Sequence, residues 1–212
     1  MQYLSKLLSF PNADKASEEG LLAIGGDLST ERLLLAYRSG IFPWYEEGQP
    51  IMWWCPNPRM VLFLSRYKIS KSLEKTINGN TFKITFNSCF SEVISNCSNI
   101  KREGQSGTWI TQNMKDAYIE LYNKGHALSV EVWIGDDLVG GLYGIDLPKC
   151  KVFCGESMFS KKKDASKVGL YYLVNKLKSK NYILIDCQMY TKHLSSLGAE
   201  EISRNEFLKY LI

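Results

Sequence analysis

The sequence predicts an α+β protein of 212 residues, with a small N-terminal domain at residues 1–60 and a mixed-sheet domain at residues 61–212. Three consecutive runs have the residue types of β-strands, at 127–134 (ALSVEVWI), 137–145 (DLVGGLYGI) and 151–159 (KVFCGESMF). An amphipathic helix and a further strand follow, an order that indicates a mixed sheet with helices on its faces. Pro56 and Pro58 interrupt regular structure just before residue 60, so we place the boundary there.

The N-terminal domain is predicted to be rich in loops and aromatic residues. Gly25 and Gly26 indicate a turn, and a helix from Thr30 to Ser39 follows and stops at Gly40. Residues 57–65 are predicted to form the passage into the second domain. We expect Trp53 and Trp54 at the contact between the two domains.

The second domain mixes helices with the strands given above. Apolar spacing and cap residues predict helices at Ser70–Ile77, Ser88–Asn96, Thr111–Lys124, 164–180 and from Asn205 onward. Further strands are predicted at 81–86 (TFKITF) and 182–188 (YILIDCQ). A turn at Gly107–Trp109 precedes the third helix, and Gly125 ends it. Asp164 or Ser166 is expected to cap the fourth helix, and Ser203 or Asn205 the last.

Charge is distributed unevenly along the chain, although the formal net charge is only +4. Residues 1–60 carry 5 Lys and Arg against 7 Asp and Glu, whereas residues 61–212 carry 21 against 15. The second domain is therefore the better candidate for a polyanionic partner. No apolar run is long enough for a signal peptide or a membrane span, which predicts a cytoplasmic protein without membrane contact.

The cysteines do not form a recognisable metal or disulfide pattern. The chain has 6 of them, without a CxxC pair, and we expect reduced thiols. Cys150, Cys154, Cys187 and His193 could meet in a zinc site, but their spacing fits no common zinc module. We therefore expect neither a metal nor a cofactor.

Eight motifs in a fixed order resemble one family. They are GLLAIGGDLS (20–29), AYRSGIFPW (36–44), PIMWWCPNPR (50–59), GTWIT (107–111), VGGLYGI (139–145), GESMFS (155–160), IDCQ (185–188) and HLSSLGAEEI (193–202). This series is similar to that of the leucyl/phenylalanyl-tRNA–protein transferases. The resemblance implies transfer of Leu, Phe and, less efficiently, Met from aminoacyl-tRNA to proteins that begin with Arg or Lys. It further implies that the new N-terminus marks those proteins for degradation by the N-end rule pathway of bacteria.

The resemblance also implies a fold, in which a small N-terminal domain sits on an acetyltransferase-like (GNAT-like) domain. We expect a monomer. Three features depart from the family pattern. The chain stops at Ile212, Leu128 replaces a second His of many members, and Thr191 stands where some relatives have Asn. The last departure puts any role of position 191 in doubt.

Aminolysis of an ester that is already activated needs alignment and oxyanion stabilisation more than a strong base. Asp186 and Gln188 lie two residues apart in a predicted strand, so their side chains should share a face. The resemblance suggests that Gln188 contacts the attacking amine and that Asp186 orients or polarises Gln188. Glu156 could favour a cationic acceptor residue or could hold the aminoacyl ammonium group, and the sequence leaves both roles open.

Substrate-binding residues follow from motif position. Trp44 and Trp109 are candidates to sandwich the terminal adenine of the tRNA. The walls of an apolar amino-acid pocket are predicted to be Leu142, Phe153, Met158, Leu170, Leu173, Leu177 and Ile185. Candidates for contact with the tRNA backbone are Arg66, Lys68, Lys71, Lys75 and Lys83, with a second cluster at Lys161, Lys162, Lys163 and Lys167.

Two other functions remain alternatives. The order of elements suits an acyl-CoA-dependent N-acetyltransferase, but the segment SKKKDASKVGL (160–170) lacks that superfamily's Q/R-x-x-G-x-G/A loop. A non-catalytic RNA-binding module would explain the tryptophans and lysines, but it would leave Glu156, Asp186 and Gln188 without a role.

Overall fold

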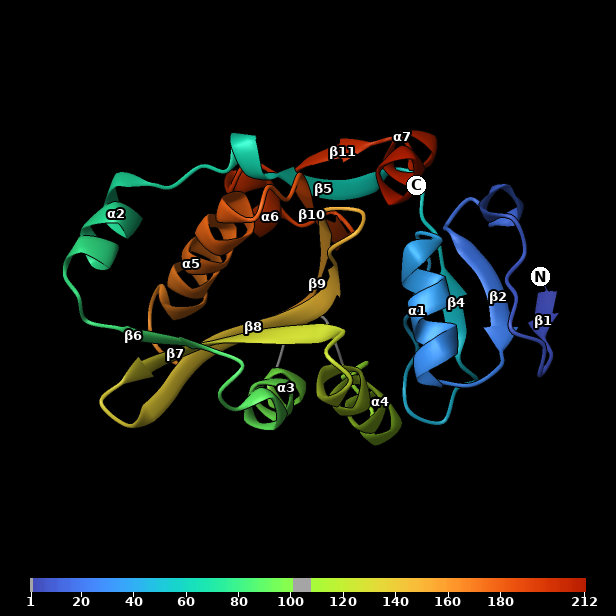
Figure 1. Cartoon of the computed structure of the whole chain (residues 1–212), viewed down its shortest axis with the longest axis horizontal. Helices are drawn as coiled ribbons and strands as arrows, with labels where there is room; N and C mark the ends of the chain where they lie inside the picture. Colours follow the sequence, from blue (N-terminus) through green and yellow to red (C-terminus); the bar gives the residue numbers. More distant parts are fainter. Residues whose placement is uncertain (1, 101–107) are drawn as a thin grey trace.

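The computed structural model describes residues 2–100 and 108–212, which form two β-sheets with helices packed around them (Figure 1). The smaller sheet has the strand order β1-β2-β4-β3. Its strands are β1 (Gln2–Leu4), β2 (Leu21–Gly25), β3 (Phe42–Pro43) and β4 (Met52–Trp54). The larger sheet has the order β11-β5-β10-β9-β8-β7-β6. Its strands are β5 (Arg59–Phe63), β6 (Lys83–Phe86), β7 (Ala127–Ile134), β8 (Asp137–Leu147), β9 (Val152–Ser160), β10 (Leu184–Gln188) and β11 (Glu200–Ile202).

Helices cover both faces of the larger sheet. The α-helices are α1 (Thr30–Arg38), α2 (Lys71–Asn78), α3 (Phe90–Asn99), α4 (Gln112–Asn123), α5 (Ala165–Ser179), α6 (Lys192–Ser196) and α7 (Arg204–Leu208). Single 3₁₀ turns occur at Ala13–Lys15, Leu64–Arg66 and Lys209–Leu211. Helix α5 packs on one face of β7, β8 and β9, and α3 and α4 lie on the other face (Figure 1). Strands β9 and β10 are parallel, and the other pairs in this sheet are antiparallel.

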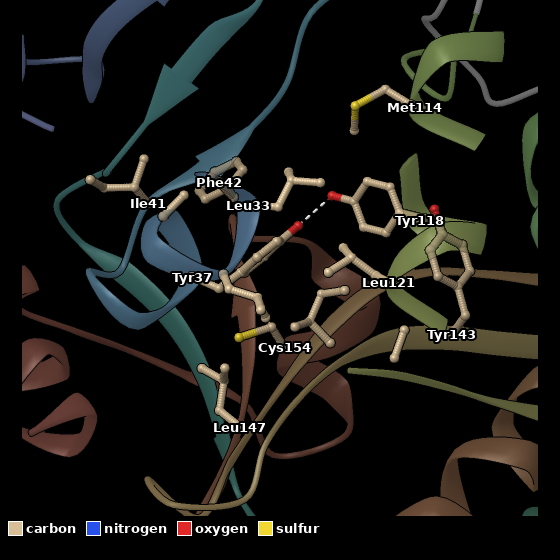
Figure 2. Packing of buried hydrophobic residues seen from close by; sticks show 14 of the residues in the cluster. Leu33, Tyr37, Ile41, Phe42, Met114, Tyr118, Leu121, Tyr143, Leu147 and Cys154 are labelled. Carbon is tan, nitrogen blue, oxygen red and sulfur yellow. Dashed lines mark hydrogen bonds between the residues drawn. The ribbon is translucent and has the colours of Figure 1, made fainter. Parts of the chain in front are cut away.

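One hydrophobic core runs from the smaller sheet into the larger one. Leu33 and Tyr37 of α1 pack with Tyr118 and Leu121 of α4, and the two tyrosine hydroxyls are hydrogen bonded (Figure 2). The same cluster continues to Cys154 of β9. The two sheets are thereby joined by buried apolar contacts, which fix the orientation of one relative to the other.

Most elements of the second domain lie where the sequence predicts them, and the mixed sheet is confirmed. Helix α1 ends as predicted at Gly40, whose φ of 73° favours glycine. Ser203 caps α7 by accepting from the backbone N–H of Glu206. Asp164 occupies the N-cap position of α5, but its side chain makes no capping hydrogen bond. The likeness to acetyltransferases stays a prediction.

Short strands are where the sequence interpretation was incomplete. Residues 1–60 contain a four-stranded sheet that was not foreseen, because strands of two to five residues are too short to show alternation. Residues 57–65 are not a simple passage, since β5 pairs with both β10 and β11. The boundary at residue 60 thus falls within β5, and the division into domains stays a prediction.

Candidate functional site

A cavity of about 570 Å³ opens between the end of β3 and the strands β8, β9 and β10. Its wall is completed by α5 and α6. One end of the cavity is polar, where Glu156 of β9 faces Gln188 of β10. The rest is lined mainly by apolar and aromatic side chains.

The polar end is built by hydrogen bonds around the carboxyl group of Glu156. Gln188 Nε2 donates to Glu156 Oε1 over 3.4 Å, and the Tyr118 hydroxyl donates to Oε2 over 3.1 Å. Tyr118 is in turn hydrogen bonded to Tyr37 (Figure 2). Glu156 is therefore held from β10 on one side and from α4 on the other.

Two irregular positions in neighbouring strands point these side chains into the cavity. Ser157 and Gly155 pair with consecutive residues of β8, so Glu156 is the extra residue of a β-bulge. Cys187 is likewise unpaired where β10 runs along β5. Bulges redirect side chains next to functional sites, and the sequence carries no period from which they can be predicted.

The bulge at Cys187 corrects one expectation from the sequence. Asp186 and Gln188 do not act side by side on one face, because the alternation between them is interrupted. Asp186 is buried beneath the cavity, and its Oδ1 accepts the backbone N–H of Gln188 over 3.1 Å. Gln188 has a φ of 58°, and its side chain lines the cavity. Asp186 thus orients Gln188 through the main chain.

Arg59 pairs with Asp186 next to this end, although the sequence patterns assign it no role. Its Nε donates to Asp186 Oδ1 over 2.8 Å and its Nη2 to Oδ2 over 2.7 Å. The guanidinium lies against two rings, with Cζ 4.8 Å from the centroid of Phe42 and 4.6 Å from that of Phe207. Its place as the last residue of the motif PIMWWCPNPR (50–59) was the signal that the sequence offered.

Burial changes the proton affinities of the groups in the cavity wall. Removal from water raises the pKa of Glu156 from its ordinary 4.5 to about 8, although hydrogen bonds from Tyr37 and Tyr118 act in the opposite direction. Asp186 adds to this rise in pKa, and Arg59 opposes it. Burial and the nearby Lys167 lower the pKa of His193, which also lines the cavity. Glu156 therefore exchanges its proton near pH 8 rather than near pH 4.5.

The predicted amino-acid pocket coincides with the apolar part of the cavity for all but one residue. The lining includes Leu142, Phe153, Met158, Leu170, Leu173 and Ile185. Leu177 is buried in the same hydrophobic cluster but does not reach the cavity. Leu62 and Leu194 also line it and were missed, because Leu62 belongs to the unforeseen strand β5 and Leu194 to the short helix α6.

Both tryptophans proposed for adenine binding line the cavity. Trp44 is 38% exposed, and its ring lies 5.6 Å from that of Trp54, whose Nε1 donates to the carbonyl of Trp44. Trp109 is partly buried. Gly107, the first residue of the turn before Trp109, lies outside the described residues. Trp53 is fully buried, and its Nε1 donates to the carbonyl of Gly25.

None of the basic residues predicted to contact tRNA lines the cavity. Those with exposed side chains are Arg66, Lys68, Lys71, Lys75, Lys83, Lys161, Lys162 and Lys163. Arg66 forms an ion pair with Glu200, and Lys167 Nζ lies 3.4 Å from Asp164 Oδ1. The positive charges of Arg66 and Lys167 are therefore partly neutralised within the chain.

The described residues form neither a metal-ligand cluster nor a membrane-spanning helix. Across 2–100 and 108–212, no group of three or more His, Cys, Asp and Glu side chains is arranged to hold a metal ion. Within the same ranges, no helix combines the length and the apolar character needed to span a bilayer.

Comparisons with known proteins identify one family. A model described as "Leucyl/phenylalanyl-tRNA protein transferase" matches residues 61–212, and the model of that family's N-terminal domain matches residues 26–57. The chain is 58% identical to the leucyl/phenylalanyl-tRNA–protein transferase of Flavobacterium psychrophilum over 100% of this chain and 99% of that protein. It is 60% identical to the protein of the same name from Flavobacterium johnsoniae, with the same coverage.

A comparison of folds found more distant structures. The structure of L-PGS from Bacillus licheniformis matches with a TM-score of 0.43 and 14% identity, covering 82% of this chain and 57% of that one. A likeness this remote indicates neither fold nor function.

Proposed function

This chain is a transferase that belongs to the leucyl/phenylalanyl-tRNA–protein transferase family, and from that premise we propose its substrates and the roles of its cavity. The proposed donors are tRNAs charged with Leu or Phe and, less well, Met. The acceptors are proteins whose first residue is Arg or Lys, and the added residue marks them for the N-end rule pathway. The observation that carries the proposal is the contact between Glu156 and Gln188 at the end of an otherwise apolar cavity.

The reaction needs no external energy source. The α-amine of the acceptor attacks the ester carbonyl carbon, a C–N bond forms, and the bond from that carbon to the ribose oxygen breaks. The amine nitrogen loses a proton, and the ribose oxygen gains one. A cavity that aligns the two substrates supplies most of what such a step requires.

Glu156 is the group best suited to take the proton from the attacking amine. Its pKa of about 8 is close to that of a protein α-amino group, roughly 7.7–8.0. Proton transfer between two groups of similar pKa costs little free energy, which favours general base catalysis near neutral pH. Gln188 donates to the same carboxyl group and fixes its orientation, which supports a positioning role for the amide.

The acidic group in the cavity supports the proposal that the acceptor is cationic. Among the described residues that line the cavity, Glu156 is the one carboxylic acid. A protein N-terminus that begins with Arg or Lys carries its positive charges toward this group, and approach of a cation favours ionisation of the carboxyl.

The apolar part of the cavity is proposed to receive the Leu or Phe side chain. Leu170 and Leu173 of α5 face Phe153 and Met158 of β9 across this space. Such a pocket accepts bulky apolar side chains and rejects charged ones, because a buried charge without a partner is costly. Leu177 is proposed to support the pocket from behind.

The rim and the basic surface are proposed to bind the tRNA. Trp44 and Trp109 provide aromatic faces for the terminal adenine, and stacking contributes about 1–3 kcal/mol per base. Exposed lysines such as Lys71 and Lys75 contact phosphates without reading sequence, so many tRNAs can serve. Binding should then weaken as salt rises.

A transfer assay tests the proposal. Phe-tRNA with labelled Phe is mixed with the full chain and a peptide that begins with Arg, and matched tubes contain an Ala-initial peptide or labelled acetyl-CoA. We expect label on the Arg-initial peptide only, and only from the tRNA. Acetyl transfer would instead support the N-acetyltransferase, and equal labelling of both peptides would contradict the acceptor specificity.

A further inference from the structure

The ion pair between Arg59 and Asp186 is the most deeply buried charged contact near the cavity. Arg59 and Asp186 are each 1% exposed, and two hydrogen bonds join them in a fork. Removing both charges from water is expensive, and well-packed apolar residues of similar size usually stabilise a fold as well or better. Stability alone is therefore a weak reason for this pair.

The pair lies where it can influence the polar end. Asp186 Oδ1, which receives Arg59 Nε, also accepts the N–H of Gln188. That bond supports the left-handed backbone of Gln188, a conformation that a residue with a side chain rarely adopts. Without a fixed Asp186, the amide of Gln188 would lose the geometry by which it reaches Glu156.

Arg59, in β5, also connects Asp186 of β10 to the aromatic side of the cavity. Its guanidinium lies against the ring of Phe42, which lines the cavity and precedes Trp44 by two residues. The guanidinium also lies against the ring of Phe207 in α7. One side chain thus contacts the smaller sheet, the catalytic strand β10 and the C-terminal helix.

We propose that Arg59 is a positioning residue for aminoacyl transfer, which fixes Asp186 and through it the orientation of Gln188, while holding Phe42 at the aromatic wall. The inference rests on the function proposed above. Arg59 touches no reacting atom in this scheme. Its effect reaches the substrates through Asp186 and Phe42, so it should appear in kcat as well as in stability.

Substitution by lysine separates positioning from charge. Arg59→Lys keeps the positive charge but replaces the fork by a single ammonium group. We expect kcat for Phe transfer to an Arg-initial peptide to fall at least tenfold per folded molecule, with KM for the peptide changed less than threefold. Folding is followed by circular dichroism and thermal unfolding on the same samples.

Arg32 supplies the matched control. It is also 1% exposed, and its Nη2 donates to the carbonyls of Ser5 and Leu7 and to Asp27, away from the cavity. Arg32→Lys should lower the unfolding temperature but leave kcat per folded molecule within twofold of wild type. If Arg59→Lys behaves as Arg32→Lys does, Arg59 is structural only and the inference is overturned.

A double-mutant cycle covers the case in which Arg59→Lys does not fold. Arg59→Met with Asp186→Asn removes both charges and leaves an oxygen that can accept the N–H of Gln188. Because the effect of Arg59 on Gln188 passes through Asp186, the double variant should lose less kcat per folded molecule than the product of the two single losses. Multiplied losses would overturn the inference. Absence of transfer by the wild-type chain would instead contradict the proposed function.

Discussion

The two ends of the cavity differ in how their side chains are held. At the polar end, Glu156 and Gln188 are fixed by directional hydrogen bonds and by strand irregularities. At the apolar end, Leu170 and Leu173 are held by packing, which has no preferred direction. Directional contacts suit a reacting group whose position must be fixed, and packing suits a side chain that varies between Leu and Phe. Changes at the first end should alter the rate of transfer, and changes at the second should alter substrate preference.

The largest effect is expected for Glu156→Gln, which removes the proposed base with little change in size. We expect kcat to fall by about 10²–10⁴-fold, the usual contribution of general acid–base catalysis, with a small change in KM for the aminoacyl-tRNA. Steady-state kinetics with both substrates varied would measure this. Glu131→Gln is the control, since Glu131 is fully buried in a separate hydrogen-bond cluster with Thr85 and Ser129. A wild-type kcat in Glu156→Gln would remove Glu156 from the chemistry.

The second effect concerns the rim between the two ends. Trp109→Ala should weaken binding of aminoacyl-tRNA by about 2 kcal/mol, or roughly thirtyfold, because one stacking face is lost. Filter binding of charged tRNA gives the Kd. The comparison variant is Trp133→Ala, since Trp133 belongs to β7 and donates to Thr85 outside the cavity. Equal weakening by both variants would mean that stability accounts for the change.

The third effect is on the pH dependence of stability. The folded chain raises the pKa of Glu156 above its ordinary 4.5 to about 8, so the folded state binds this proton more tightly than the unfolded state does. The favourable contribution is complete below about pH 4.5 and is lost as pH rises through 8. Glu156→Gln cannot ionise, so its stability relative to wild type should increase by about 4 kcal/mol between pH 5 and pH 9. Urea unfolding at both pH values measures the difference, and a constant difference would argue against a buried neutral carboxyl.

The smallest effect is expected at the apolar end. Leu173→Phe fills part of the pocket, which should shift the ratio of Leu to Phe transfer by about tenfold toward Leu, with kcat for Leu nearly unchanged. Competition between Leu-tRNA and Phe-tRNA in one tube reports the ratio. Leu177→Phe is the control, because Leu177 is buried nearby but does not line the cavity. An unchanged ratio in Leu173→Phe would remove position 173 from the selection of the amino acid.

The sequence predicted regular elements better than irregular ones, and the site depends on the irregular ones. The pattern of residue types over 127–134 predicts the strand β7. The side chain of Thr111 caps α4, and this cap residue predicts where the helix begins. Glu156 and Gln188 were identified by motif. The contact between their side chains depends on two β-bulges, which no sequence periodicity predicts.

Long-range partners were also beyond the sequence. Arg59 and Asp186 are 127 positions apart in the chain, so their pairing follows only once β5 lies beside β10. Tyr118 of α4 donates to Glu156 of β9, although the two residues are 38 positions apart in the chain. Leu177 was assigned to the pocket because helical spacing gives the buried face of α5 but not the depth at which the cavity ends.

The proposed chemistry requires a carboxyl group at the polar end that exchanges its proton near neutral pH. Isotope-edited NMR of glutamate carboxyl groups, with Glu156→Gln used to assign the signal, follows that group as pH changes. We expect a titration midpoint near 8 for Glu156 in the free protein. A Glu156 carboxyl that is already ionised at pH 5 would contradict a proton acceptor of this kind.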